Sequence, residues 1–303
     1  MALVQEFGYV AYGVTDLEES VDFFRNVCLL EVSERRPDTV FLTGDARHAW
    51  LRLERTTRPG LIRVGFRVVN AAALDEIKSR LGGEGIEWSE GGSVKDNRID
   101  NAIRFRTPQG FELELYEEQV VLPASPVPAR GFDRALHAVV FVEDIVAGRE
   151  FFKRVLGFHR SDQIEDIVVF LRCANGYHHS VGLAKGEAGQ LDHMAILLDG
   201  VDTVVKFRNH ARALGIKSED LVKHAASGSV SAYVEDPASG IGIEFCTGHD
   251  QIFDETYNGR LLKAGPATAD MWSAGFADVT PSGVFQGRGG GTRAADLASR
   301  PDA

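Results

Sequence analysis

Cysteine is scarce in this 303-residue chain, and the few cysteines lie far apart. The three are Cys28, Cys173 and Cys246, and no Cys-x-x-Cys pair occurs. An odd number of distant cysteines argues against a disulfide framework, and the missing close pairs argue against a structural zinc site. This cysteine usage suits a reducing compartment, so we expect a cytoplasmic protein.

Long apolar runs and basic runs are also missing. No stretch reaches the roughly 18 apolar residues that a transmembrane helix needs. The N-terminal residues lack a basic start and a long apolar core, so we expect no signal peptide. The net charge of −11 is spread along the chain, which argues against a nucleic-acid surface and against binding to anionic membranes. We therefore expect a soluble protein with neither nucleic-acid nor membrane partners.

What the chain does contain is an internal repeat. Segments 16–27 and 144–155, offset by 128 residues, share a leading aspartate, a Phe-Phe pair and a valine at matching positions. A hydrophobic content of 44% gives each copy enough apolar residues for a core of its own. The length and the repeat together predict two similar compact domains.

Each copy opens with a strand, continues with a helix and then returns to strands. Residues 7–14 and 135–142 are the opening strands, and an aspartate follows each of them as the expected helix N-cap. Two more helices are predicted over 71–81 and 202–214, each closed by glycine. This order gives four βαβββ modules, two per copy, and indicates an α+β fold. We expect each pair of modules to form a curved mixed sheet with its helices outside.

Composition sets the predicted domain boundaries. The proline-rich segment 122–131 reads as a linker between the halves. The first domain then covers residues 1–121 and the second covers 132–265. Residues 266–303 form a C-terminal tail, which has loop composition from about residue 275.

Only the second copy is rich in histidine. Of the nine histidines, His48 lies in the first copy and the others lie between His137 and His249. Seven residues before the matching aspartates stand Tyr9 in the first copy and His137 in the second. Because a duplicated scaffold carries imidazoles on one side, we expect the second half to perform the chemistry and the first half to support it.

Two histidines and one carboxylate of the second half form a candidate metal site. His137 sits on a strand, His193 opens another, and Glu244 lies on a third. Side chains from three strands can converge inside a curved sheet. Two histidines and one carboxylate, with positions left open, are the ligand set of non-haem Fe(II) oxygen chemistry. Taken singly, a strand histidine is more often a hydrogen-bonded core residue, and a glutamate at a strand end is more often solvated.

The matching positions of the first half predict no second metal. Arg63 aligns near His193, and Glu114 matches Glu244 by its spacing from a glycine. The first half therefore keeps one carboxylate and lacks both imidazoles.

Three segments of the second half carry a resemblance to a known family. They are Leu136-His137, the run from Tyr177-His178-His179 to Asp192-His193, and the run from His224 through Tyr233, Asp236-Pro237 and Gly240 to Glu244. Together with the repeat, they resemble the vicinal oxygen chelate superfamily (glyoxalases, bleomycin resistance proteins and dioxygenases). Within it they resemble the two-domain type I extradiol ring-cleavage dioxygenases, over roughly residues 5–250. One departure is a turn at 238–240 that looks one residue longer than the family's.

The resemblance implies a metal and a reaction. His137, His193 and Glu244 would bind Fe(II), and Mn(II) accepts the same ligand set. The protein would be an extradiol, or meta-cleavage, dioxygenase that opens a catechol-type ring with O2 in aromatic catabolism. Its partners would be a catechol-type small molecule and O2, and we expect a homo-oligomer.

The resemblance also implies catalytic roles for His179, His224 and Tyr233. Imidazole exchanges protons near neutral pH, so His179 is the candidate acid/base. Strand alternation favours it over His178. Tyr233 shares a polar strand face with two serines, which suits a hydrogen bond to a substrate oxygen. The role of His224 rests on the resemblance alone.

Two rival functions stay open. One is another metal-dependent enzyme of this scaffold, such as a glyoxalase-like isomerase or lyase. The other is a non-enzymatic small-molecule binding protein of the resistance type. The sequence does not say which catechol is bound, or whether five further residues reach the site, namely Cys246, His249, Asp250, Arg260 and Lys263.

Overall fold

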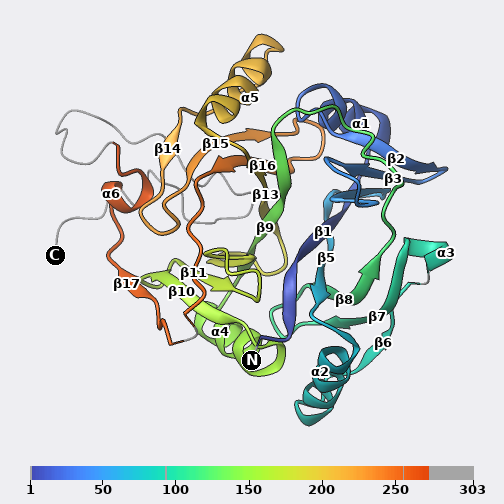
Figure 1. Cartoon of the computed structure of the whole chain (residues 1–303), viewed down its shortest axis with the longest axis vertical. Helices are drawn as coiled ribbons and strands as arrows, with labels where there is room; N and C mark the ends of the chain where they lie inside the picture. Colours follow the sequence, from blue (N-terminus) through green and yellow to red (C-terminus); the bar gives the residue numbers. More distant parts are fainter. Residues whose placement is uncertain (1, 93, 255, 273–303) are drawn as a thin grey trace.

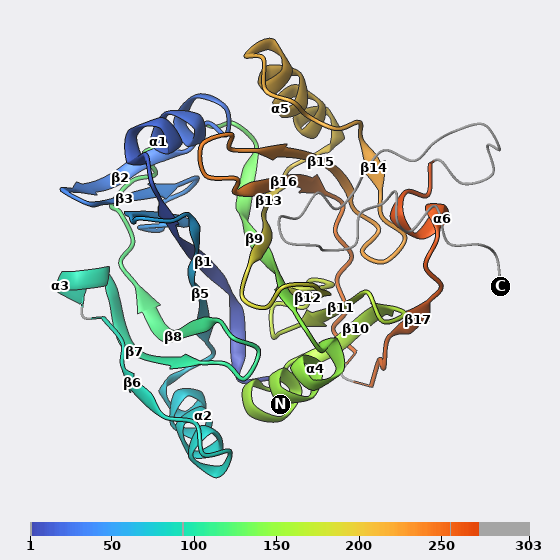
Figure 2. The same ribbon diagram turned by 180° about the vertical axis from the view of Figure 1, so that it is seen from behind.

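The computed structural model describes residues 2–92, 94–254 and 256–272 (Figure 1). Each half of the chain forms one large mixed sheet, and the longer helices lie on the outer faces of the two sheets (Figures 1 and 2). Most of the predicted tail, residues 273–303, lies outside the described residues. Among the helices described, none is both long enough and apolar enough to cross a membrane.

The first sheet contains eight strands in the order β2-β3-β4-β1-β5-β8-β7-β6. Its elements are β1 (Val4–Val14), α1 (Leu17–Asn26), β2 (Glu31–Arg36), β3 (Thr39–Thr43), β4 (Leu51–Arg55), β5 (Gly60–Val68), α2 (Ala71–Gly83), β6 (Trp88–Glu90), α3 (Val94–Asn97), β7 (Ile99–Arg106) and β8 (Glu112–Gln119). The central pair β1 and β5 is antiparallel, whereas β1 and β4 are parallel.

The second sheet repeats this arrangement and adds one strand, giving the order β14-β15-β16-β13-β9-β12-β11-β10-β17. Its elements are β9 (Phe132–Val142), α4 (Ile145–Leu156), β10 (His159–Ile164), β11 (Val168–Arg172), β12 (Val181–Lys185), β13 (Leu191–Leu198), α5 (Val201–Ala213), β14 (Val222–Lys223), β15 (Val230–Glu235), β16 (Gly242–Thr247), β17 (Arg260–Leu262) and α6 (Pro266–Ala269). The predicted α+β fold of four βαβββ modules is confirmed.

Local sequence explains where the first helix of each half begins. The Asp16 carboxylate accepts a hydrogen bond from the backbone N–H of Glu19 (3.0 Å), and Asp144 caps α4 in the same way. Such caps satisfy N–H groups that have no partner within the helix. The Phe-Phe pair of each helix is then buried against its sheet, as Phe24 and Phe152 show.

The two halves share one hydrophobic core. Strands β1 and β9 lie side by side at the centre of the molecule (Figures 1 and 2). The rings of Phe66 and Phe158, one from each half, meet edge to face with centroids 5.6 Å apart. The backbone N–H groups of Ala174 and Asn175 donate to carbonyl oxygens of β1, both at 3.0 Å. The first half therefore holds the loop that precedes β12.

Strand register relates the two halves residue by residue. In the second sheet His137 lies opposite Ala195, and Ala195 lies opposite Glu244. In the first sheet Tyr9 and Glu114 lie opposite one shared residue of β5 in the same way. The sequence alignment of Tyr9 with His137 and of Glu114 with Glu244 is thus also an alignment of positions in space.

Candidate metal centre

Three neighbouring strands bring His137, His193 and Glu244 together. They lie on β9, β13 and β16, which are adjacent in the second sheet. All three side chains are buried, and their ligand atoms form one of two groups of potential metal-binding residues within the described residues. The convergence follows from register, because β13 pairs with both of the other strands.

The donor atoms fit one shared metal ion. The Glu244 Oε2 atom lies 3.0 Å from His137 Nε2 and 3.2 Å from His193 Nε2, and the two Nε2 atoms are 3.3 Å apart. Ligand atoms at about 2.0–2.2 Å from one ion lie about 3 Å from one another when they subtend right angles. Two imidazoles and one carboxylate therefore present three donors at the spacing that a six-coordinate ion needs.

The hydrogen bonds around Glu244 favour its ionised form, which is the form that binds a metal. Burial raises the pKa of Glu244, but hydrogen bonds from His137 and His193 outweigh it and hold that pKa well below its usual range. The Glu244 Oε1 atom accepts a 2.5 Å hydrogen bond from the Ser231 hydroxyl. The carboxylate is therefore ionised and fixed in orientation by a neighbouring strand.

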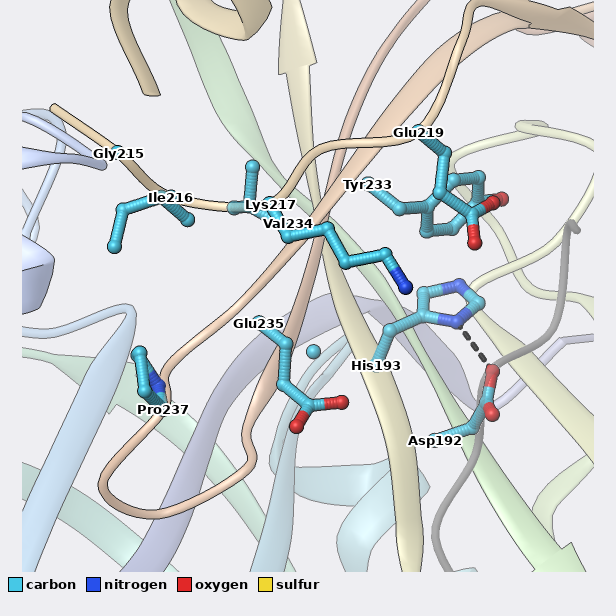
Figure 3. A pocket seen from close by; sticks show the side chains of 11 residues that line it. Asp192, His193, Gly215, Ile216, Lys217, Glu219, Tyr233, Val234, Glu235 and Pro237 are labelled. Atoms are coloured by element: carbon cyan, nitrogen blue, oxygen red, sulfur yellow. Dashed lines mark hydrogen bonds and ion pairs between the residues drawn. The ribbon is translucent and has the colours of Figure 1, made fainter. Parts of the chain in front are cut away.

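The two histidines are supported differently. The Asp192 carboxylate lies 2.7 Å from Nδ1 of His193 (Figure 3). Burial lowers the pKa of His193, but hydrogen bonds to Asp192 and Glu244 raise it to about 9. His137 has no partner at Nδ1 within the described part of the chain, and burial lowers its pKa.

A small cavity of about 30 Å³ lies against the three candidate ligands. Its other lining residues are Val139, Ile164, Phe170, His179, His224, Ala226, Ser227, Tyr233, Thr268 and Ala269. The three residues expected to be catalytic therefore line one cavity together with the candidate ligands. Apolar and small side chains complete the wall of this cavity.

His179 and His178 precede β12 rather than lying on it. The ring of His179 lies against the ring of His137, with centroids 4.0 Å apart and the planes tilted by 40°. Burial lowers the pKa of His179 well below the usual value. His178 turns the other way and lies 3.1 Å from the Asp162 carboxylate. His179 lines the small cavity and His178 does not, and both rings are buried.

His224 and Tyr233 form a hydrogen-bonded pair. The Tyr233 hydroxyl lies 2.9 Å from His224 Nε2, and His224 Nδ1 lies 3.1 Å from the carbonyl oxygen of Ala269. A carbonyl oxygen only accepts, so Nδ1 carries the hydrogen, and a neutral His224 accepts the Tyr233 hydrogen at Nε2. Burial lowers the pKa of His224 and raises that of Tyr233 well above its usual value, which keeps both groups neutral.

The short helix α6 completes the site. Sequence composition placed residues 266–303 in a tail, yet Thr268 and Ala269 line the small cavity. The Asp270 carboxylate accepts a hydrogen bond from the backbone N–H of Lys223 (3.0 Å), which ties this segment to β14. The first residues of the tail therefore belong with the second half.

The corresponding position in the first half is filled by other side chains. The Tyr9 hydroxyl donates to the buried Glu114 carboxylate, and Arg104 lies 2.5 Å from the same carboxylate. Arg63, which matches His193, pairs with Glu112 at 2.7 Å. A phenol and an arginine thus stand where the second half has imidazoles.

The five residues left open by the sequence lie in different surroundings. Cys246 packs in a small apolar cluster beneath β13, and the buried His249 ring has no hydrogen-bond partner within the described residues. The Asp250 side chain is exposed. Arg260 binds Asp162 at 2.5 Å rather than lining the small cavity, and Lys263 does not line it either.

Sequence reasoning missed Asp162 as part of this region. Asp162 lies on β10 and its partner His178 precedes β12, so no short spacing links them. The signal was present in the repeat, because Glu34 stands 128 residues earlier. A carboxylate at the matching position of the second strand in both copies would have pointed to a shared kind of partner.

A second, larger cavity of about 480 Å³ shares His193 and Tyr233 with the first (Figure 3). It lies at the ends of β13, β15 and β16 and under the loop after α5. Lys217 extends from that loop toward His193 (Figure 3). The candidate centre thus borders two cavities.

These features define a duplicated βαβββ protein with a candidate metal centre in one half. The chain belongs to the Glyoxalase/Bleomycin resistance protein/Dioxygenase superfamily, whose sequence model matches residues 6–115 and 134–245. The predicted superfamily is therefore confirmed.

Two curated relatives are metal-dependent dioxygenases by name. A manganese-dependent 2,3-dihydroxybiphenyl 1,2-dioxygenase of Geobacillus genomosp. 3 is 27% identical over 289 residues, covering 84% of this chain and 88% of the relative. An iron-dependent extradiol dioxygenase of Rhodococcus jostii (strain RHA1) is 26% identical over 300 residues, covering 90% and 98%.

Solved structures agree with the fold. A Mn(II)-bound glyoxalase from Novosphingobium aromaticivorans superposes with a TM-score of 0.84 at 20% identity, covering 100% of this chain and 96% of the other. A variant of homoprotocatechuate 2,3-dioxygenase from B. fuscum gives 0.81 at 22% identity, covering 89% and 79%. At these identities the likeness establishes the fold alone, and function has to be argued from the site.

Proposed function

We propose that this protein is an Fe(II)-dependent extradiol dioxygenase, with Mn(II) as the alternative metal, that opens a catechol-type ring next to its diol. The observation that carries the proposal is the buried group of His137, His193 and Glu244 beside a cavity lined by His179 and Tyr233. The names of the two curated relatives support it, since one is iron-dependent and the other manganese-dependent.

His137, His193 and Glu244 would hold the metal. When bound, the metal supplies Lewis acidity and open positions at which a diol and dioxygen can meet. The protein contributes a dry, shaped cavity around that point, with Val139 and Phe170 in its wall. Excluding water protects the reacting groups from side reactions.

His179 is the proposed acid/base. Its low pKa leaves the ring neutral and able to accept a proton from a catechol hydroxyl. The protonated ring is then able to return a proton to an oxygen atom that comes from dioxygen, as the O–O bond breaks. The buried surroundings shorten the lifetime of the charged form, which favours this return.

Tyr233 and His224 are proposed to position the substrate. Because the Tyr233 hydrogen points to His224, the lone pairs of the phenol oxygen are left to accept a hydrogen bond from a catechol hydroxyl. The carbonyl of Ala269 fixes His224 in turn. The pair would orient the diol rather than exchange protons with it.

Oxygen uptake tests the proposed reaction. We expect anaerobically prepared protein loaded with Fe(II) to consume one dioxygen per catechol and to retain both oxygen atoms in the opened ring. Labelled-oxygen mass spectrometry over a panel of catechols measures this. Retention of one atom, after correction for solvent exchange, would instead indicate a monooxygenase.

The three candidate catalytic residues predict a graded series of variants. We expect His179→Ala to keep its iron and lose about 10²–10⁴ in kcat, the usual cost of removing an acid/base. Tyr233→Phe removes one hydroxyl and should lose less. His224→Ala should fall between the two or resemble Tyr233→Phe. Iron content and kcat are measured together. An iron-replete His179→Ala protein with wild-type turnover would remove His179 from the mechanism.

The rival functions make different predictions in the same assays. A glyoxalase-like isomerase or lyase would bind metal and consume no oxygen. A resistance-type binding protein would hold neither metal nor an oxygen-dependent activity. We further propose a cytoplasmic homo-oligomer. We propose domains 1–121 and 132–265 with the linker 122–131, and residues 266–272 pack against the second domain.

A further inference from the structure

We propose that Asp162 and His178 are positioning residues that fix the tautomer of His179, so that Nε2 of His179 acts as the base toward the catechol. This inference rests on the proposed dioxygenase function and deepens it. It adds to the reaction two residues that line neither cavity.

A continuous chain of hydrogen bonds links these groups. Arg260 binds the Asp162 carboxylate at 2.5 Å, and the same carboxylate lies 3.1 Å from Nε2 of His178. On the other side of the ring, Nδ1 of His178 lies 3.0 Å from Nδ1 of His179. Asp162, His178 and His179 are all buried, so water does not compete for these contacts.

The chemistry of the donors decides where each hydrogen lies. A carboxylate only accepts, so Nε2 of His178 carries a hydrogen and donates it to Asp162. In a neutral His178 the other nitrogen, Nδ1, is then an acceptor. Its partner, Nδ1 of His179, has to carry the hydrogen. The remaining nitrogen of His179, Nε2, therefore holds a lone pair.

Asp162 is already paired with a cation. Burial raises the pKa of Asp162, but hydrogen bonds from His178 and Arg260 outweigh it and lower that pKa to about 2. Because the Arg260 guanidinium balances the Asp162 charge, the three groups carry no net charge when His178 is neutral.

The first half contains the same unit without the catalytic ring. Glu34 matches Asp162, lies 2.9 Å from Nε2 of the buried His48 and pairs with Arg98 at 2.7 Å. Ala49 stands where the second half has His179. Ala49 lies two residues before the first residue of β4, which pairs with β1. His179 lies two residues before the first residue of β12, which pairs with β9. Nδ1 of His48 accordingly has no partner within the described residues.

The carboxylate–histidine–arginine unit has a structural effect in both halves and a catalytic effect in one. The carboxylate–histidine–arginine unit stabilises the fold in both halves. Only the second half places a histidine against the free nitrogen of that unit. There the unit also fixes the hydrogen position of His179, the proposed base.

The proposed step is a single proton transfer. The O–H bond of a catechol hydroxyl breaks, the electron pair stays on the oxygen, and an N–H bond forms at Nε2 of His179. The positive charge on His179 is stabilised by its N–H donation to His178, whose own hydrogen is held by Asp162. No oxidant or co-reactant enters this step.

A matched pair of variants tests the proposal in the full-length protein. Asp162→Asn should keep iron and KM but lose about 10²–10⁴ in kcat, because an amide no longer enforces the tautomer. Glu34→Gln breaks the equivalent unit of the first half and should leave kcat unchanged. Equal losses in both variants would show that the unit acts only through stability and would overturn the proposal.

A second pair keeps the test decisive if Asp162→Asn fails to fold. The amide oxygen of His178→Asn can replace the accepting Nδ1, whereas His178→Leu removes it. We expect the asparagine variant to exceed the leucine variant about tenfold or more in kcat, which is the effect of about one hydrogen bond. Equal turnover of the two variants would contradict the proposed role of His178 in fixing the His179 tautomer.

Nitrogen NMR reads the tautomer without any turnover. In metal-free protein labelled with ¹⁵N-histidine, we expect His179 to be protonated at Nδ1 and unprotonated at Nε2. A protonated Nε2 of His179 would overturn the proposed tautomer. If the wild-type protein consumed no oxygen with any catechol, the proposed function would fail, and this spectrum would still decide the tautomer.

Discussion

At the scale of single residues, the two candidate histidine ligands differ in what holds them. Asp192 accepts a hydrogen bond from His193, whereas Nδ1 of His137 has no partner in the described part of the structure. A carboxylate behind a ligating imidazole fixes the ring and strengthens it as a donor. The affinity for metal should therefore depend on Asp192 although Asp192 is no ligand.

We predict that Asp192→Asn weakens metal binding by about 10–100-fold, the usual effect of removing such a partner. Chelator competition with Fe(II) or Mn(II) measures the dissociation constant. Asp199→Asn, at an exposed position just after the same strand, is the control and should bind as the wild type does. An unchanged dissociation constant in Asp192→Asn would contradict the assigned role.

The repeat offers a matched test of the carboxylate ligand. We predict that Glu244→Gln loses its metal, because a neutral amide is a poor ligand beside two imidazoles. Glu114→Gln changes the equivalent buried carboxylate of the first half and should retain one metal per chain. Elemental analysis after gel filtration, with circular dichroism to check folding, measures both. Metal retained in Glu244→Gln would remove Glu244 from the centre.

Residue types and spacing predicted the candidate ligands, because the repeat exposed where imidazoles replace Tyr9 and Arg63. The repeat aligns Asp162 with Glu34, but spacing alone could not give the partners of Asp162 or Ser231. These partners lie elsewhere in the sheet, and register is set by tertiary packing rather than by local spacing. The two contacts became visible only once the strand pairs were known.

At the scale of elements, ionic contacts tie the edges of the first sheet together. Glu34 on the edge strand β2 pairs with Arg98, which precedes β7 near the opposite edge. Hydrogen bonds from Arg98 chiefly, and from Arg36 and His48, lower the pKa of Glu34 to about 2, against the opposing effect of desolvation. The sheet is therefore closed by a contact that depends on the charge of one carboxylate.

This contact predicts a pH-dependent stability. A depressed pKa stabilises the folded state above the unfolded value of about 4.3, and the gain is lost as pH falls toward 2. Glu34→Gln should cost about 1–3 kcal/mol at pH 7, with the difference shrinking between pH 4 and 2. Urea unfolding across that range measures it. Glu18→Gln, in an exposed pair with Arg35, is the control and should change little.

The main helices and opening strands could be predicted, because caps, glycines and apolar spacing act locally. The helices predicted over 71–81 and 202–214 are observed as Ala71–Gly83 and Val201–Ala213. The short elements β17 and α6 could not be predicted. Each spans only three or four residues, and tertiary contacts with β10 and β14 hold them in place.

At the scale of the whole molecule, the duplication produces one site rather than two. We predict one metal ion per chain, since Tyr9 and Arg63 replace the imidazoles in the first half. Added metal at 100 times its dissociation constant should raise the free energy of unfolding by about 2.7 kcal/mol. Elemental analysis and thermal unfolding with and without a chelator measure this. Two ions per chain would show that the first half also binds.

The hydrogen bonds from Ala174 and Asn175 to β1 have a consequence for heat inactivation. These residues lie just before His178 and His179, so the seam between the halves anchors the loop that carries the proposed base. Local breaking of these hydrogen bonds to β1 would release the loop while the second sheet stayed intact. Loss of activity on heating would then measure the breaking of these hydrogen bonds, and it would begin below the temperature at which either sheet unfolds.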